Sequence, residues 1–211
     1  MPILKKDNKI IYFSHIPKCG GMAIEQYCKD VGIEISFIDH GYHSISSKNI
    51  WNNTSPQHID NFSFGRLFPE KFFLDYFTVV RNPIDRLVSA FNFGKYVVKN
   101  IEKSKRFLDF IDEDLDVCSK QINFYDNHFL EQNKMIVNIG KSKIFKIENG
   151  LNNVKEYIDD IFFNEPLKMK IKTVNKGKKL RNKNEDDLND IYKNKIYKIY
   201  KKDFKFFDYD I

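Results

Sequence analysis

The sequence predicts a single α/β domain, residues 1–211, whose central strands are covered by helices on both faces. Two stretches support this prediction, residues 9–29 (KIIYFSHIPKCGGMAIEQYCK) and residues 73–93 (FLDYFTVVRNPIDRLVSAFNF). Each contains a β-branched and aromatic run, then a break with proline or glycine, then a helix-like segment. The apolar runs lack the alternation of a half-exposed strand, which indicates burial on both faces. A chain of 211 residues is long enough to bury a sizeable core.

The break in the first stretch has the composition of an anion-binding turn. Pro17 is rigid, Lys18 is cationic, and Gly20 and Gly21 can adopt positive φ. A helix that begins here directs unpaired backbone N–H groups and the positive end of its dipole at one point beyond the strand. That point suits a phosphate or sulfate group, and Lys18 adds a full charge. An ordinary strand–helix turn with a solvated lysine is the simpler alternative for a Gly-Gly pair alone.

The second stretch repeats this architecture with an arginine at the end of the strand. The apolar run ends at Val80, Arg81 follows it, and Pro83 falls in the first turn of the expected helix. Ser89 lies two helical turns further on, so Arg81 and Ser89 could both face a second anion. The structural alternative for Arg81 is an ion pair with a carboxylate such as Asp85.

Composition limits the class of protein. The net charge of +6 suits anionic ligands or sulfated and acidic acceptors, but no RNA- or DNA-binding motif accompanies it, so we expect no nucleic acid partner. Cys19, Cys28 and Cys118 leave an odd count without metal-ligand spacing, which favours a reducing compartment and no bound metal. No apolar run before Lys9 resembles a signal peptide and none is long enough to span a bilayer, so we expect a soluble protein.

The other elements follow from local composition. We expect a strand within 32–38, a helix over 44–50, a polar surface excursion over 51–66, and continuation of the second helix to residue 99. A solvent-facing acidic helix should cover 109–116, with short strands at 136–137 and 144–147 and an amphipathic helix over 151–163. The basic segment 168–183 is either a lid over an anionic ligand or a solvated loop. A closing helix over 186–202 completes the domain.

The two motifs together resemble the cofactor loops of a known enzyme family. HIPKCGG after one strand and VRNPIDRLVSAF after a later strand are similar to those of sulfotransferases that use 3′-phosphoadenosine 5′-phosphosulfate, in the carbohydrate-type branch. The resemblance covers nearly the whole chain and implies a three-layer parallel sheet flanked by helices, the P-loop NTPase-like sulfotransferase fold. It implies transfer of a sulfonate group to a hydroxyl of a carbohydrate or similar acceptor. Eukaryotic Golgi members carry a membrane anchor, so the expected location is cytoplasmic, or the Golgi lumen for a trimmed catalytic domain.

The resemblance also assigns roles to residues of both loops. Lys18 stabilises the departing phosphate oxygen, and a lysine emerging from the anion-binding turn suits that task. The amides of Gly20, Gly21 and Met22 hold the 5′-phosphate, whereas Arg81 and Ser89 bind the 3′-phosphate, which the planar guanidinium can grip through two oxygens. The predicted cofactor-binding set is therefore Pro17, Lys18, Cys19, Gly20, Gly21, Met22, Ala23, Arg81 and Ser89.

A histidine is the expected base, because its pKa allows proton uptake near neutral pH. Of the five histidines, His43 resembles in placement the catalytic histidine of heparan-type sulfotransferases, and His40 is the second choice. His15 precedes the turn and should orient it. His58 and His128 carry no argument from the sequence. Arg86 is expected to be solvated or to pair along its helix.

The chain departs from the family at the first turn of the helix. Relatives usually carry Ser or Thr where this chain has Met22 and Ala23, and a lost hydrogen bond to a charged group costs about 1.5–3 kcal/mol. A non-catalytic nucleotide- or glycan-binding module of the same fold is therefore the alternative. A P-loop kinase is a weaker alternative, because Lys18 precedes Gly20 and no Ser or Thr follows to hold magnesium. Sulfonate transfer needs no metal ion.

Overall fold

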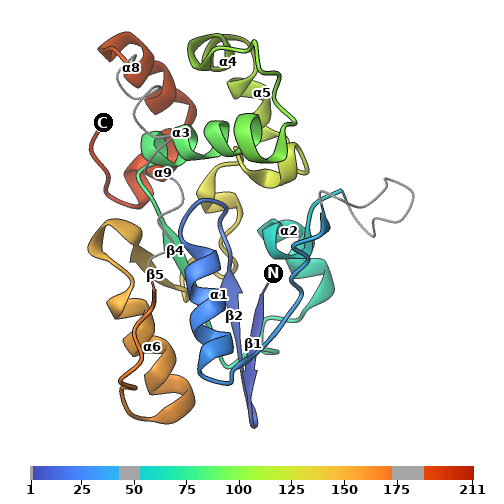
Figure 1. Ribbon diagram of the computed structural model, residues 1–211, viewed down its shortest axis with the longest axis vertical. Helices are drawn as coiled ribbons and strands as arrows, with labels where there is room; N and C mark the ends of the chain where they lie inside the picture. The colour runs from blue at the N-terminus through green and yellow to red at the C-terminus, as the bar shows by residue number, and fades with distance from the viewer. Residues whose placement is uncertain (1, 43–52, 173–187) are drawn as a thin grey trace.

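The computed structural model describes residues 2–42, 53–172 and 188–211. Its centre is a five-stranded sheet in the order β3-β1-β2-β4-β5. The strands are β1 (Ile3–Lys6), β2 (Lys9–Ser14), β3 (Glu34–Ser36), β4 (Asp75–Val80) and β5 (Lys143–Lys146). β4 pairs in parallel with β2 and β5, whereas β1 is antiparallel to both β2 and β3. The predicted α/β class, with parallel strands flanked by helices, is confirmed (Figure 1).

The hairpin of β1 and β2 is an addition that the sequence analysis did not predict. Lys6 pairs with Lys9, and Asp7 in the turn between them has a φ of 51°, a left-handed value that aspartate tolerates. Only two residues of β1, Ile3 and Leu4, are apolar and buried. A run this short does not predict a strand from sequence.

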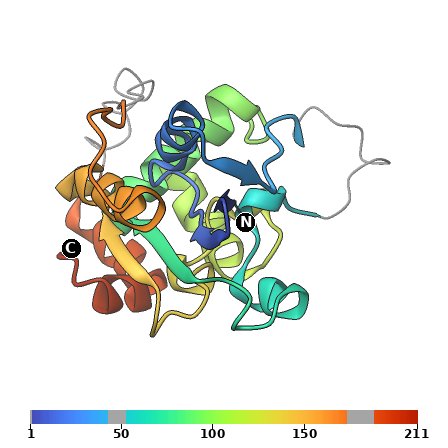
Figure 2. The same cartoon turned by 90° about the horizontal axis from the view of Figure 1, so that it is seen from below.

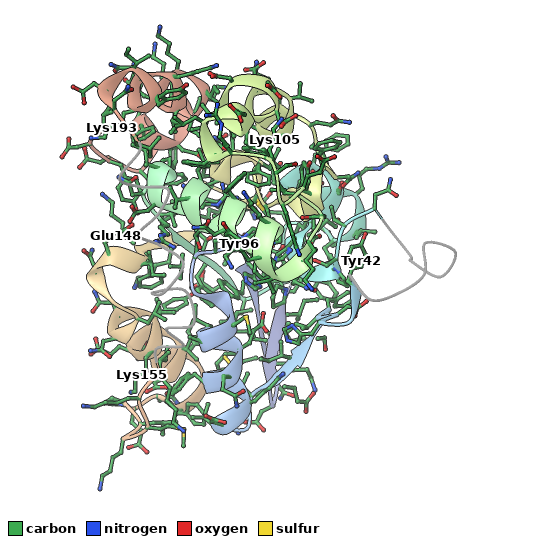
Figure 3. The ribbon with its side chains drawn as sticks, turned by 45° about the horizontal axis from the view of Figure 1, so that its top comes forward. Tyr42, Tyr96, Lys105, Glu148, Lys155 and Lys193 are labelled. Carbon is green, nitrogen blue, oxygen red and sulfur yellow. The ribbon has the colours of Figure 1, made fainter. Side chains whose placement is uncertain are left out.

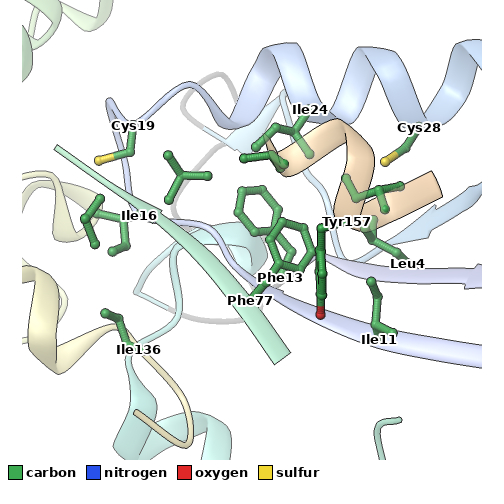
Figure 4. Packing of buried hydrophobic residues seen from close by; sticks show 14 of the residues in the cluster. Leu4, Ile11, Phe13, Ile16, Cys19, Ile24, Cys28, Phe77, Ile136 and Tyr157 are labelled. Atoms are coloured by element: carbon green, nitrogen blue, oxygen red, sulfur yellow. The ribbon is translucent and has the colours of Figure 1, made fainter. Parts of the chain in front are cut away.

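Helices cover the two faces of the sheet unequally. Helix α1 (Gly21–Asp30) and helix α6 (Asn152–Phe163) pack on one face, where Phe13 and Phe77 stack with ring centroids 4.7 Å apart (Figure 4). The opposite face presents Tyr12 and Tyr76 to Phe64 of helix α2 (Asn61–Leu67). Figure 2 shows α2 across the strands from α1. Successive residues of β2 and β4 are thus buried on alternate faces, which explains the uninterrupted apolar runs.

A second group of helices packs at the carboxyl ends of the parallel strands (upper part of Figure 1). They are α3 (Pro83–Phe93), α4 (Phe107–Glu113), α5 (Leu115–Lys120), α8 (Asp190–Ile199) and α9 (Lys201–Phe206). A π-helical turn, Gly94–Val98, continues α3 and accounts for the predicted extension to residue 99. The single closing helix predicted over 186–202 is instead the two helices α8 and α9, which meet at Tyr200.

Several local predictions can be compared directly with the structure. The strand at 144–147 and the helix at 151–163 are confirmed by β5 and α6, whereas residues 136–137 lie in a buried loop. The predicted surface excursion is wrong for residues 54–60, which are buried because Ser55 bonds Asp126 and Ile59 packs in the apolar cluster of Tyr12. The helix predicted at 44–50 and most of the basic segment 168–183 lie outside the described residues. Within the described ranges, no helix combines the length and apolarity that crossing a bilayer requires.

Candidate active site

The two predicted loops follow neighbouring strands of the sheet. Ser14, the last residue of β2, pairs in register with Thr78 of β4, and the Thr78 hydroxyl donates to the Ser14 carbonyl at 2.8 Å. Because the two strands are parallel, both loops leave the sheet at the same edge. Ligands of open α/β sheets bind outside this carboxyl edge. The fold therefore places both motifs where a shared ligand could lie.

The two glycines of the first loop are needed for different reasons. Gly20 has a φ of 85°, the left-handed region that glycine adopts without a steric cost. Gly21 opens α1 against the imidazole of His15, and a Cβ on Gly21 would lie 2.0 Å from His15 Nε2. His15 therefore packs into the space that the missing side chain leaves, as expected for a residue that orients the turn.

The start of α1 directs donors at the point where the loop closes. The amides of Gly21 and Met22 belong to the first helical turn, where the helix itself supplies no acceptor. The Ala23 amide differs, because it donates to the Gly20 carbonyl at 3.0 Å. Met22 is 60% exposed, and its thioether offers no hydroxyl to an anion at this point. The backbone part of an anion site is thus present without side-chain hydroxyls from 22 and 23.

Lys18 is held in a protected position beside an aromatic ring. Its backbone φ is 69°, and its Nζ lies 3.9 Å from the centroid of the Phe93 ring at the end of α3. Burial, reinforced by the charge of Arg81, lowers the Lys18 pKa from 10.5 to about 8. The ammonium is therefore poorly hydrated, and an anion beside it would be attracted more strongly than in water.

Arg81 joins the two loops directly. Its Nη1 lies 3.4 Å from the Lys18 carbonyl oxygen, and its Nη2 lies 3.7 Å from Asp85 Oδ2. The guanidinium side chain is 13% exposed. Ser89, one turn beyond Asp85 on α3, is half-buried. The ion pair considered as the structural alternative is present, together with the contact between the loops that a shared ligand site requires.

Two buried side chains to which the sequence analysis assigned no role in the site hold the loops in place. The Gln132 amide pairs with the main chain of Arg81, accepting from its N–H at 3.0 Å and donating to its carbonyl at 2.9 Å. Arg86 donates to the Pro17 carbonyl at 3.1 Å and to the Leu130 carbonyl at 2.9 Å. The prediction that Arg86 is solvated or pairs along its helix is wrong, because it is 2% exposed and bonds carbonyls of other segments. Its position among the apolar residues of VRNPIDRLVSAF was the available signal, whereas Gln132 had none.

Cys19 contributes to the interior and does not turn its side chain to the anion-binding point. Its thiol is buried and lies 3.5 Å from Gln132 Oε1. Burial raises the Cys19 pKa to about 12, so the group is a neutral thiol at physiological pH. A role for Cys19 in holding a phosphate is therefore restricted to its backbone.

Glu25 of α1 bridges two of the predicted histidines. Its Oε1 lies 3.0 Å from His15 Nδ1 and its Oε2 lies 3.2 Å from His40 Nε2. Burial lowers the His15 pKa to about 4, so this ring is neutral. Burial opposes the charge of Glu25, yet its histidine neighbours hold its pKa below the usual value. The His40 side chain is 54% exposed, and His43 lies outside the described residues.

His58 belongs to a row of aromatic and histidine rings that ends at Lys18. His58 Nδ1 lies 2.7 Å from Asp126 Oδ2, and its ring meets those of His15 and His128 edge-on, each with centroids 5.1 Å apart. The His128 ring stacks on the Phe93 ring with centroids 5.2 Å apart, and the Lys18 ammonium contacts the same Phe93 ring. Burial holds the His128 pKa well below its usual range. A histidine oriented by a carboxylate is the arrangement of a general base, and sequence analysis could not find it because Asp126 is 68 residues away.

The edges of the site are defined by the carboxyl ends of β4 and β5. The Asn82 amide donates to Glu148 at 2.7 Å, and the Tyr209 hydroxyl donates to the same carboxylate at 2.8 Å. Figure 3 shows Glu148 between α6 and the upper helices.

A surface hollow of about 430 Å³ lies at the other end of β4, lined by residues 70–76 with Asn138 and Lys141. None of the predicted site residues that fall within the described ranges lines that hollow.

Comparison with known proteins gives one match. The model of a sulfotransferase family matches residues 2–210. No curated protein and no solved structure matches the chain. The match covers both loops, Arg86 of α3 and Gln132.

Proposed function

Because this chain belongs to the sulfotransferase family, we propose that it moves a sulfonate group from 3′-phosphoadenosine 5′-phosphosulfate to a hydroxyl of a carbohydrate or similar acceptor. The observation that carries the proposal is the 3.4 Å approach of Arg81 Nη1 to the Lys18 carbonyl. It brings the two anion-binding loops to one edge of the sheet, as one doubly phosphorylated nucleotide requires. The non-catalytic module and the P-loop kinase of the sequence analysis are the alternatives that the experiments below separate.

Lys18 would act on the leaving group. In an in-line displacement the acceptor oxygen bonds to sulfur while the bond from sulfur to the bridging phosphate oxygen breaks. Negative charge then develops on the departing phosphate, beside the Lys18 ammonium and the amides that open α1. Because its pKa is about 8, Lys18 can carry its charge at neutral pH and also give a proton to that oxygen.

Arg81 and Ser89 would hold the 3′-phosphate. Gln132 fixes the main chain from which the Arg81 side chain projects, because its amide bonds both the N–H and the carbonyl of Arg81. Its contact with Asp85 at 3.7 Å is long for a charge-assisted hydrogen bond, so a phosphate can compete for the same donors. Pro17 and Cys19 would serve by shaping the loop, the first through its carbonyl bond to Arg86.

The acceptor must lose a proton to a base during transfer. His43, the residue expected from the resemblance, remains a prediction, with His40 as its alternative. The described residues add His58, whose Nδ1 is engaged by Asp126 and whose ring lies in the row that leads to Lys18. A carboxylate on one ring nitrogen fixes the tautomer and the orientation of the ring.

The first experiment tests ligand recognition by thermal shift. Adenosine 3′,5′-bisphosphate, the product nucleotide, should raise the Tm, whereas ATP with magnesium should do little. Replacing Arg81 by Ala should weaken the bisphosphate about 10- to 150-fold, the equivalent of one charged hydrogen bond, with a smaller loss for AMP. Arg66→Ala, on the exposed surface of α2, is the matched control. Equal losses for both nucleotides would place the 3′-phosphate elsewhere.

The second experiment separates an enzyme from a binding module. Transfer of ³⁵S-labelled sulfonate to a panel of glycans should be detected with the native chain and lost in Lys18→Ala. His43→Ala, His40→Ala and His58→Ala should then be compared for rate at unchanged bisphosphate affinity. Binding without transfer to any acceptor would favour the module. Stabilisation by ATP with magnesium but not by the bisphosphate would favour the kinase.

A further inference from the structure

Three buried side chains form a cluster that the proposed reaction does not fully use. His58, Asp126 and His128 each offer one ligating atom, and these atoms all lie within 4.8 Å of one another. His58 is the last residue of the short helical turn Pro56–His58, whereas Asp126 lies in the short helical turn Tyr125–Asn127 and His128 directly follows that turn. Only the fold brings them together, because 68 residues separate His58 from Asp126.

The donor set has the chemistry of a transition-metal site. Two imidazoles and one carboxylate suit Zn²⁺, with magnesium and calcium disfavoured because those ions prefer all-oxygen ligands. Zinc bonds of about 2.0–2.2 Å in tetrahedral geometry place ligand atoms about 3.3–3.6 Å apart. His58 Nδ1 and Asp126 Oδ2 are 2.7 Å apart, and the widest separation in the cluster stays under 4.8 Å. Small adjustments of the side chains would therefore create the site.

Neighbouring groups already fix the ligands as the outer shell of a metal site would. The Ser55 amide donates to Asp126 Oδ1 at 2.7 Å, and its hydroxyl donates to Oδ2 at 2.9 Å. His128 Nδ1 lies 3.0 Å from the Tyr125 carbonyl, so in the neutral ring the lone pair is on Nε2. Hydrogen bonds of this kind orient ligating histidines and carboxylates in metalloproteins.

The backbone that presents two of the ligands is held in an uncommon conformation. Tyr125, Asp126 and Asn127 have φ values of 47°, 54° and 57°. The Asn127 side chain donates to the His58 carbonyl at 2.8 Å, which ties the two segments together. Consecutive left-handed residues persist only where the surroundings stabilise them, and they concentrate at functional sites.

We propose that His58, Asp126 and His128 form a binding site for Zn²⁺ or a similar divalent transition metal. Binding the metal occupies the His58 nitrogen that Asp126 now engages and removes the carboxylate that orients the ring. Loss of transfer activity on metal binding is a second consequence, which rests on the proposed function and on His58 as the proton acceptor. The metal site itself does not depend on either.

Metal binding is tested without any activity assay. Metal-free native chain is titrated with Co²⁺, whose visible d–d absorption reports coordination number and ligand type, and the affinity for Zn²⁺ is measured by competition. Saturable binding with a tetrahedral Co²⁺ spectrum is expected. Because outer-shell changes alone cost 10–100-fold in affinity, Asp126→Asn and His128→Gln should each cost at least about tenfold. His40→Gln, outside the cluster, is the control.

Three results would overturn the metal site. They are no saturable binding by the native chain, unchanged affinity in both Asp126→Asn and His128→Gln, and the intense near-ultraviolet bands of thiolate–cobalt bonds, which would assign the metal to a cysteine. Circular dichroism establishes that the variants are folded, and the native-chain titration decides the question if they are not. Zn²⁺ inhibition of transfer, reversed by a chelator, would extend the proposal. Tight binding without inhibition would uphold the site and refute His58 as the proton acceptor.

Discussion

Replacing Lys18 by Met should stabilise the fold while removing transfer activity. Lys18 is half-buried beside Phe93, and its loss of hydration together with the charge of Arg81 lowers its pKa from 10.5 to about 8. A folded-state pKa below the unfolded value means that folding disfavours the protonated form. Below pH 8 both states hold the proton, so the folded state bears the whole cost. Met has a similar unbranched shape and can stay against the ring without a charge.

The size of the effect follows from the pKa difference. At 1.36 kcal/mol per pKa unit, the difference between 10.5 and about 8 corresponds to about 3 kcal/mol. The lost attraction between the ammonium and the Phe93 ring offsets about 0.5–2 kcal/mol of this. We therefore expect Lys18→Met to raise the free energy of unfolding by about 1–3 kcal/mol at pH 7. The rate of transfer should fall by about 10²–10³, the usual loss when one group that stabilises transition-state charge is removed.

Urea denaturation at several pH values measures the stability term. Between pH 8 and 10.5 the native lysine is deprotonated in the folded state and protonated in the unfolded state, so native stability should rise with pH and the advantage of Lys18→Met should shrink. Lys103→Met, at an exposed loop position, is the control and should change little. A Lys18→Met protein that is no more stable than the native chain at pH 7, or a gap that does not depend on pH, would refute this account of Lys18.

Further predictions concern ligand binding and the loop supports. Binding of adenosine 3′,5′-bisphosphate at pH 9 should take up a proton, because the phosphate raises the Lys18 pKa again. Calorimetry in buffers of different ionisation enthalpy measures this proton uptake, and Lys18→Met should abolish the uptake. Gly21→Ala should destabilise the fold by about 1–3 kcal/mol, because the added Cβ collides with His15. The loss of stability caused by Gly21→Ala should be smaller when His15→Ala is also present. Additive losses in denaturant titrations would contradict the contact between Gly21 and His15. Arg86→Met should cost about 3 kcal/mol or more, since it leaves buried carbonyls unpaired, and a cost under 1 kcal/mol would mean that water replaces the guanidinium.

The features of the site that depend on neighbouring residues were predictable from sequence. The strand, the glycine turn and the first helix are contiguous, and so are β4, Arg81 and α3. Parallel pairing of β2 with β4, which brings the two together, agrees with the expectation from their uninterrupted apolar runs. Gln132 could not be found, because its role depends on an amide meeting the main chain of a residue 51 positions earlier.

The histidines show the same limit more sharply. His58 is a polar residue in a stretch of Asn, Ser and Gln, which is typical of a surface loop. It is buried because Ser55 and Asp126 satisfy its hydrogen bonds, and neither partner can be inferred from the local pattern. Burial of polar residues is decided by such long-range pairing, so composition alone misplaced the whole segment 54–60.

The side-chain amide of Gln132 bonds the main chain of Arg81 as an adjacent strand would. It therefore extends the hydrogen bonding of the sheet by one residue beyond the end of β4. Since Arg86 secures the other loop to the chain just before Gln132, the backbone of both loops is braced from within the domain and not by the surface segments around it. Residues on the outer rim can therefore change without shifting the two loops. If the loops hold the donor as proposed, this mechanical independence would let acceptor specificity change separately from the transfer chemistry.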